Sequence, residues 1–183
     1  MNVFYRGVDN PVDVGCSGFG SDKVSFNLNN GTYKKASAAG SYFISPTKLG
    51  EAMVTVMVDI DGKKKEMGRK VFRVKDLPDP VAKVGGKKSS AVEKSWLGLQ
   101  SRITAELDGS EFEYKFTVME FNVSAVIGGF SNDKLSKSEL ISPEQANLIK
   151  NCPRGQKIRF EDIKVMGPEG TPRTLQTLTF KLN

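Results

Sequence analysis

The chain has 183 residues, of which 38% are hydrophobic and 26% are charged, and its net charge is +6. This composition supports the buried core of one large or two small domains and excludes a chain that is disordered throughout. The absence of histidine excludes a Ser-His-Asp triad, a Cys-His pair and a histidine-ligated zinc site within this chain. No apolar run approaches the roughly 20 residues that a membrane-spanning helix needs.

The basic residues do not gather on a nucleic-acid-binding motif. The lysine triplet 63–65 follows Asp61-Gly62, and we interpret it as the solvated tip of a hairpin. The two cysteines, Cys16 and Cys152, form no CxxC pair; we expect two buried thiols, with an inter-domain disulfide as the alternative. The composition therefore predicts no nucleic-acid partner, no metal and no cofactor.

Short strands separated by turn residues dominate the first 75 residues. Segments 2–7, 12–15, 23–28 and 41–45 are candidate strands, and the valines of 53–60 alternate with polar or flexible residues. Asp61-Gly62 predicts a hairpin turn, with a connection that extends to Gly68 before the partner strand at 69–75. Strands at this spacing predict an immunoglobulin-like β-sandwich over residues 1–77.

The sequence "LPDP" separates this domain from the rest of the chain. Proline restricts its own φ and biases the preceding residue toward extended conformations. We therefore predict a stiff linker at residues 78–81, with the inter-domain hinge at Leu77, Pro78, Asp79 and Pro80.

Residues 82–183 are predicted to form a second β domain. Within a strand predicted at 112–127 the hydrophobic alternation changes phase near Met119-Glu120, and a second change falls around Glu161-Asp162. A slip of one residue moves every following side chain to the other face, so each change predicts a bulge or corner.

One short helix is predicted at residues 143–150. Ser142 is placed as N-cap, Pro143 occupies the first helical position, and Gln145 completes a capping box. The chain is thus predicted to be mainly β, with two tandem β-sandwich-like domains, the first immunoglobulin-like and the second with one short α-helix.

No catalytic site is predicted. We interpret the glycine-rich segment 15–20 as a turn, since no helix follows it to bind phosphate. Glu111 and Glu113 are interpreted as the solvated side of a strand.

Partner binding is predicted on the second domain. The segment 128–142 is polar and predicted to be a long loop, and loops of this kind often bind partners. Its apolar residues Phe130, Leu135 and Leu140 are candidate anchors, as is Trp96, the only tryptophan. The alternative is that these side chains pack inside the domain.

Three blocks of sequence occur in a characteristic order. They are "NVFYRGVDNPVDV" at 2–14, "FRVKDLPDPVAKVGGK" at 72–87 and "GPEGTPRTL" at 167–175. Together they resemble the C-terminal half of the GldM family, also called PorM, of gliding motility and type IX secretion. The family usually has aspartate where this chain has Glu169.

The resemblance implies a place in a larger machine. Family members work as homodimers, and an N-terminal transmembrane helix joins them to a small inner-membrane motor partner. Their distal periplasmic domains reach an outer-membrane-associated ring, built from a lipoprotein and its partner protein. This chain is then expected to be the last two periplasmic domains, non-enzymatic and without direct membrane contact. From the architecture alone, a surface adhesion or carbohydrate-binding module is the alternative.

Overall fold

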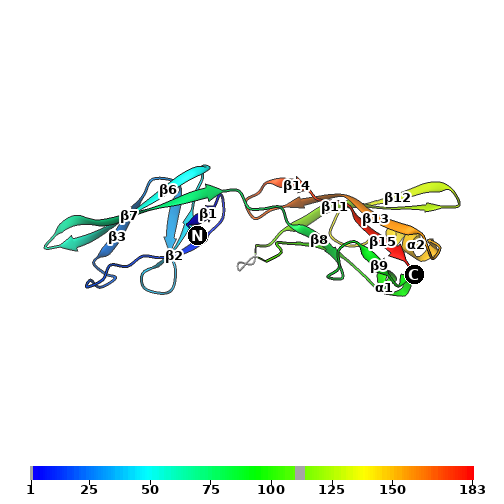
Figure 1. Cartoon of the computed structure of the whole chain (residues 1–183), viewed down its shortest axis with the longest axis horizontal. Coiled ribbons are helices and arrows are strands. Elements are labelled where there is room, and N and C mark those ends of the chain that lie inside the picture. Colours follow the sequence, from blue (N-terminus) through cyan, green and yellow to red (C-terminus); the bar gives the residue numbers. More distant parts are fainter. Residues whose placement is uncertain (1, 110–113) are drawn as a thin grey trace. The chain divides into compact units, whose positions relative to one another are not determined.

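The computed structural model describes residues 2–109 and 114–183, and these are mainly β-strands, as predicted (Figure 1). The chain divides into two compact units, Met1–Leu77 and Pro78–Asn183. Glu111, Glu113 and the start of the strand predicted from residue 112 lie outside the described residues. None of the described helices has the length and apolar content needed to cross a membrane.

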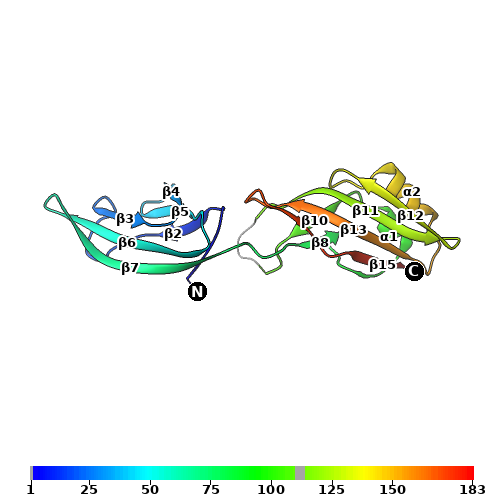
Figure 2. The same ribbon diagram turned by 90° about the horizontal axis from the view of Figure 1, so that it is seen from above.

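The first unit is a two-layer sandwich. Its described strands are β1 (Val3–Tyr5), β2 (Asn10–Asp13), β3 (Val24–Leu28), β4 (Thr32–Lys35), β5 (Ser41–Ser45), β6 (Gly50–Ile60) and β7 (Lys63–Lys75). One sheet has the order β1-β7-β6-β3 and the other β2-β5-β4, and Figure 2 shows β4 and β5 as a layer over β6 and β7. Strands β3, β6 and β7 thus share one sheet, which β1 joins at its edge, and β2, β4 and β5 form the other sheet. This is the immunoglobulin arrangement, which confirms the predicted fold.

The core of this unit lies between the two sheets. Ile44 of β5 and Val58 of β6 are fully buried, and the rings of Phe4 and Phe72 stack with their centroids 4.0 Å apart. Val54 is also buried, so the alternation read from β6 correctly identified its inner face. Each sheet hides its apolar side against the other, which is the main stabilising contribution in a sandwich.

The β6–β7 hairpin differs from the prediction at its turn. Ile60 pairs directly with Lys63, so β7 begins six residues before the predicted Arg69. Asp61 and Gly62 have φ of 52° and 79°, which is the conformation that a two-residue type I′ turn requires. The lysine triplet therefore belongs to a strand and is not a loop at the tip.

A bulge inside β7 explains why the connection looked longer. Val56 pairs with Gly68 while the next residue, Met57, pairs with Glu66, so Met67 is an extra residue. Such an insertion shifts the alternation by one place, and in the sequence it resembles a break between strand and loop.

The second unit combines two sheets with two short helices. Its described elements are β8 (Val81–Val84), β9 (Ser90–Val92), α1 (Lys94–Gly98), β10 (Ile103–Glu106), β11 (Thr117–Ile127), β12 (Phe130–Ser136), α2 (Pro143–Asn151), β13 (Lys157–Met166), β14 (Pro172–Thr174) and β15 (Leu178–Leu182). The main sheet has the order β12-β11-β13-β15-β9, with β14 also paired to β13, and β8 pairs with β10. Phe121, Phe160 and Phe180 are fully buried at its centre, with ring centroids 5.9 and 5.7 Å apart.

Two bulges in the main sheet confirm both predicted phase changes. On β11, Val118 pairs with Val165 and Glu120 with Lys164, so Met119 is the extra residue. On β13, the extra residue falls between Glu161 and Lys164, where Asp162 has a φ of 52°. One bulge lies on each partner strand, so they cancel and the original register resumes beyond them.

Several elements were not predicted, including the short strands β4 and β9. Strand β12 occupies the segment that the sequence suggested was a loop, because Gly128 and Gly129, with φ of 60° and 84°, make a tight turn directly after β11. Helix α1 is a second helix beside the predicted one. Strand β8 begins at Val81, which the prediction placed in the linker.

Helix α2 begins as predicted. The Ser142 hydroxyl accepts a hydrogen bond from the Gln145 backbone N–H, and the Gln145 side chain accepts one from the Ser142 N–H. The helix ends at Asn151, followed by Cys152, which is fully buried. Cys16 is half-buried against the core of the first unit, and both thiols are free.

Candidate partner-binding surface

The four predicted anchor residues are all at least partly exposed. Phe130 and Leu135 lie on β12, Leu140 lies in the connection to α2, and Trp96 lies on α1. The exposed fractions are 78% for Phe130, 49% for Leu135 and 48% for Leu140, whereas Trp96 is half-buried. Exposure alone does not make them one surface, because a partner must reach them together.

The pairing of β12 with β11 separates the two anchors on the strand. Phe130 pairs with Ile127, on the same face as the buried Val123 and Phe121. Leu135 pairs with Asn122 and therefore lies on the opposite face, since directly paired residues share a face and successive residues alternate. Phe130 and Leu135 thus cannot contact the same flat partner surface.

Trp96 is largely occupied within its own domain. The Lys87 ammonium lies 4.3 Å from the centroid of the indole ring, in a cation–π contact. The Phe180 ring lies 6.3 Å away, and the Trp96 carbonyl accepts a hydrogen bond from the Gln100 side chain. These contacts favour a packing role over a stacking platform for a sugar.

Leu140 lies close in space to the end of α1. Arg102 and Leu140 form a β-bridge, and the Ile141 backbone N–H donates to the Ser101 carbonyl. The Arg102 guanidinium also contacts Glu139 at 3.3 Å. Leu140 therefore belongs with the helical side of the domain, and not with the β12 hairpin tip that carries Phe130.

Strand β12 is one of the two end strands of the main sheet. Within the described chain β12 pairs only with β11, so its other edge presents unpaired backbone groups. Sequence analysis did not predict this edge. Strand β12 has seven residues, of which all but Asn132 and Ser136 are exposed, and this length is enough to pair with a strand from another protein, although Lys134 makes indiscriminate pairing less favourable.

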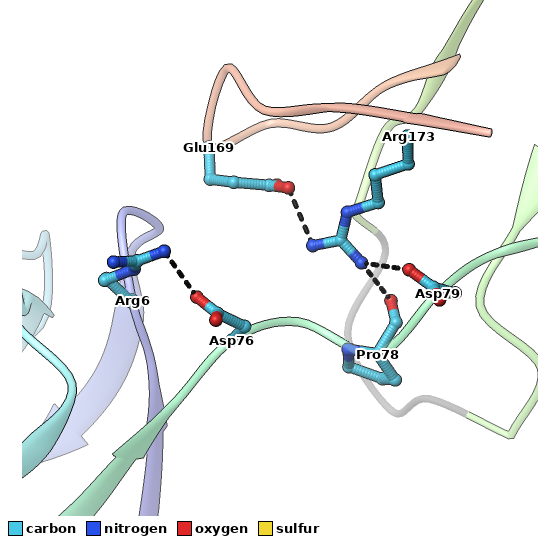
Figure 3. A network of polar contacts seen from close by, with 6 residues as sticks. All are labelled: Arg6, Asp76, Pro78, Asp79, Glu169 and Arg173. Atoms are coloured by element: carbon cyan, nitrogen blue, oxygen red, sulfur yellow. Dashed lines mark hydrogen bonds and ion pairs between the residues drawn. The ribbon is translucent and has the colours of Figure 1, made fainter. Parts of the chain in front are cut away.

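Arg173, which sequence analysis did not single out, holds the predicted hinge residues to the second unit (Figure 3). Its guanidinium donates to the Pro78 carbonyl at 3.0 Å and to the Asp79 carboxylate at 2.9 Å. It also forms an ion pair with Glu169 at 2.8 Å, and the side chains of Arg173 and Glu169 are only 13% and 9% exposed. Burial by itself lowers the pKa of Arg173, but the hydrogen bonds that its guanidinium donates to Glu169 and Asp79 outweigh this effect and raise the pKa.

The end of the first unit has a contact of its own. Asp76 forms an ion pair with Arg6 at 2.8 Å, with both side chains well exposed (Figure 3). Leu77 and Pro80, the other two predicted hinge residues, are both buried. The residues on either side of Leu77 are therefore each bound to their own unit.

Comparison with known families covers both units. Residues 1–75 match the family model described as the GldM third domain, and residues 78–183 match the one described as the GldM C-terminal domain. A search of curated proteins gives no match.

Two solved structures show a weak likeness. The fibronectin(III)-like modules of CbhA from Clostridium thermocellum share 16% identity with a TM-score of 0.31, over 100% of this chain and 89% of that chain. The adhesin InvE of Yersinia pseudotuberculosis shares 14% identity with a TM-score of 0.22, over 86% of this chain and 48% of that chain. Scores this low say nothing about how the chain functions.

Proposed function

This chain belongs to the GldM family and comprises its third and C-terminal domains, and from this membership we propose a non-enzymatic linking role in the periplasm. The chain is a component of gliding-motility and type IX secretion machinery. In the proposal, the full-length protein is anchored in the inner membrane beside a small motor partner. The two domains of this chain extend from there to the outer-membrane-associated ring of a lipoprotein and its partner protein.

The observation that carries this proposal is the short junction between the two family domains. Asp76 is bound to Arg6 in the first unit, Pro78 is bound to Arg173 in the second, and Leu77 between them is buried, so no long unstructured linker joins the two units. A long flexible linker would absorb displacement by changing its end-to-end distance, whereas a junction of one residue transmits it. This property suits a protein that passes force between two membranes.

Separate fragments of the two units test where the ring binds. We expect residues 78–183 to capture the ring proteins from a cell-envelope extract and residues 1–77 not to capture them, because the free β12 edge lies on the second unit. The second fragment has to begin at Pro78, since a later start would remove the groups that Arg173 binds. Capture is measured by quantitative mass spectrometry of the bound proteins.

The reverse pattern, with capture by residues 1–77 alone, would overturn the assignment to the second unit. A glycan array with the whole chain tests the carbohydrate-binding alternative. The linking role predicts no glycan binding, and saturable binding that is lost in Trp96→Ala would favour the alternative.

We also propose that the chain forms a homodimer. Strand β9 ends the main sheet opposite β12 and pairs only with β15 among the described strands, so its outer edge is a surface that a second copy can cover while β12 stays available. Light scattering over a concentration series is expected to show twice the monomer mass of 20.0 kDa at the upper end. A constant monomer mass at every concentration would contradict dimerisation by these two domains.

A further inference from the structure

A groove of about 670 Å³ lies between the two helices of the second unit. Leu99, Pro143, Ala146 and Ile149 supply its apolar lining. Leu99 is 82% exposed, the largest exposed fraction among the large hydrophobic residues described. Covering a leucine this exposed, beside a concave apolar surface, removes apolar area from water and therefore favours the binding of another molecule there.

The two helices present this groove because their other faces are buried. On α2, Gln145, Leu148 and Ile149 pack inward. Pro143, Ala146, Asn147 and Lys150 recur at helical spacing and form an outward stripe. Proline and alanine are small, so a side chain of a bound molecule can pack closely against this part of the helix surface.

Leu99 is held at the other wall by the end of α1. Its backbone N–H donates to the Trp96 carbonyl, and the neighbouring Leu97 is fully buried and anchors the helix. Because the buried Leu97 fixes this short helix in place, Leu99 at its end is held in an exposed position. This wall depends on α1, which the sequence did not predict.

The rim of the groove is positively charged. Lys94, Lys150 and Arg154 line it, and no acidic side chain does. In the described part of the chain these three residues form no ion pair, whereas Lys83 and Lys164 of the same unit each contact a carboxylate. The Lys94 charge also acts at the end of α2: burial raises the pKa of the Cys152 thiol, and Lys94 opposes this rise.

We propose that this groove binds an acidic, amphipathic segment of a protein partner. An apolar side chain of the segment packs between Leu99 and the outward stripe of α2, and its carboxylates face Lys94, Lys150 and Arg154. The proposal rests on the proposed linking role and deepens it by naming the chemistry of a partner. Charge complementarity of this kind accelerates association and selects the partner.

A protein segment fits better than the other anionic ligands. Nucleic-acid binding depends on many phosphate contacts, and three cations beside an apolar wall provide few of them. A lipid surface is flat on this scale and does not fill a concave groove. An acidic amphipathic segment satisfies both the apolar lining and the charged rim.

The test uses fluorescence anisotropy with the whole 183-residue chain. The probe is a fluorescein-labelled helical peptide with leucines at positions i, i+3, i+4 and i+7 and glutamate elsewhere, and its matched control has glutamine for every glutamate. We expect the glutamate peptide to bind at least about tenfold more tightly than the glutamine peptide. Leu99→Asn is expected to weaken binding by roughly tenfold or more, since Leu99 would be covered by the bound peptide and supply much of the apolar contact.

Charge reversal separates the groove from general attraction to a basic protein. Lys150→Glu with Arg154→Glu is expected to lower the affinity by about tenfold or more, whereas Lys137→Glu with Lys157→Glu, which changes the net charge equally outside the groove, leaves it within about twofold. All four positions are exposed, so the variants are expected to keep the wild-type melting temperature.

Equal losses in the two double variants would overturn the proposal, as would equal binding of both peptides. Binding to phosphatidylglycerol vesicles that needs Lys150 and Arg154, without peptide binding, would assign the groove to lipid instead. Because the probe is synthetic, these outcomes do not depend on capture of the ring proteins. If the peptide does not bind the groove but residues 78–183 still capture the ring proteins, only the groove proposal is overturned and the linking role is not.

Discussion

Replacing Arg173 by methionine is expected to lower the free energy of unfolding of the second unit by about 3 kcal/mol. The substitution leaves Glu169, whose side chain is 9% exposed, without its cationic partner. The Glu169 Oε2 atom already accepts no hydrogen bond from the described residues, so none of these residues offsets the loss. Asp79 is 79% exposed, and its ion pair with Arg173 contributes little by comparison.

The effect can be measured on the second unit alone. Trp96 is the only tryptophan of the chain, so tryptophan fluorescence during urea unfolding reports that unit. At this unit's size the expected loss corresponds to a fall in melting temperature of roughly 10 °C or more. The first unit holds three of the four tyrosines, and the fragment of residues 1–77, followed by tyrosine fluorescence, gives the unfolding transition that this unit is expected to keep in the variant.

A double variant distinguishes the lost ion pair from lost packing. Arg173→Met with Glu169→Met removes both charges, and it is expected to recover most of the stability lost in the single variant. If the double variant is no more stable than Arg173→Met, the ion pair is not the cause. Faster proteolysis near Pro78–Pro80 is expected in both variants, because both lose the bond to the Pro78 carbonyl.

Replacing Gln145 by leucine is expected to destabilise the second unit by a comparable amount, about 3 kcal/mol. The Gln145 side chain is fully buried, and its amide donates to the carbonyls of Phe121 on β11 and Lys134 on β12. Its oxygen also accepts from the Ser142 backbone N–H at 3.0 Å. A leucine fills the space but leaves three buried or half-buried polar groups without this partner.

Two further variants separate the hydrogen bonds from Gln145 to the sheet from its role in the helix cap. Ser142→Ala removes only the capping hydroxyl, and we expect a loss of about 1 kcal/mol. Equal losses for Ser142→Ala and Gln145→Leu would show that Gln145 serves only the cap.

Gln145→Glu keeps the acceptor but places a carboxylate against two carbonyl oxygens. Burial raises the pKa of such a carboxyl above its unfolded value. The stability of this variant is therefore greatest at acidic pH, where the carboxyl is protonated and can donate, and it falls as the pH rises through the folded pKa. Urea midpoints from about pH 4 to 8 measure this trend. A urea midpoint that follows the wild type across this range would show that the hydrogen bonds from Gln145 to Phe121 and Lys134 do not stabilise the unit.

What the sequence determined by itself is what short-range chemistry encodes. The capping box at Ser142 and Gln145 depends on residues three apart, and the structure contains it as predicted. The inner face of β6 and the phase changes near Met119 and Asp162 follow from the two-residue period of a strand, which any buried face imposes. These patterns sufficed for the mainly β fold, whereas the family resemblance rests on the three sequence blocks at 2–14, 72–87 and 167–175.

The tertiary structure alone decided the features that depend on distant residues. Strand β12 is polar along most of its length because it lies at an edge, so its sequence shows no hydrophobic alternation that predicts a strand. For the same reason Phe130 and Leu135 were predicted to act together, although they lie on opposite faces. Neither the bond from Arg173 to Pro78, across 95 positions, nor the groove between α1 and α2 leaves a local signal. Such contacts arise only when packing brings the segments together, since their stabilisation depends on burial that a linear sequence does not specify.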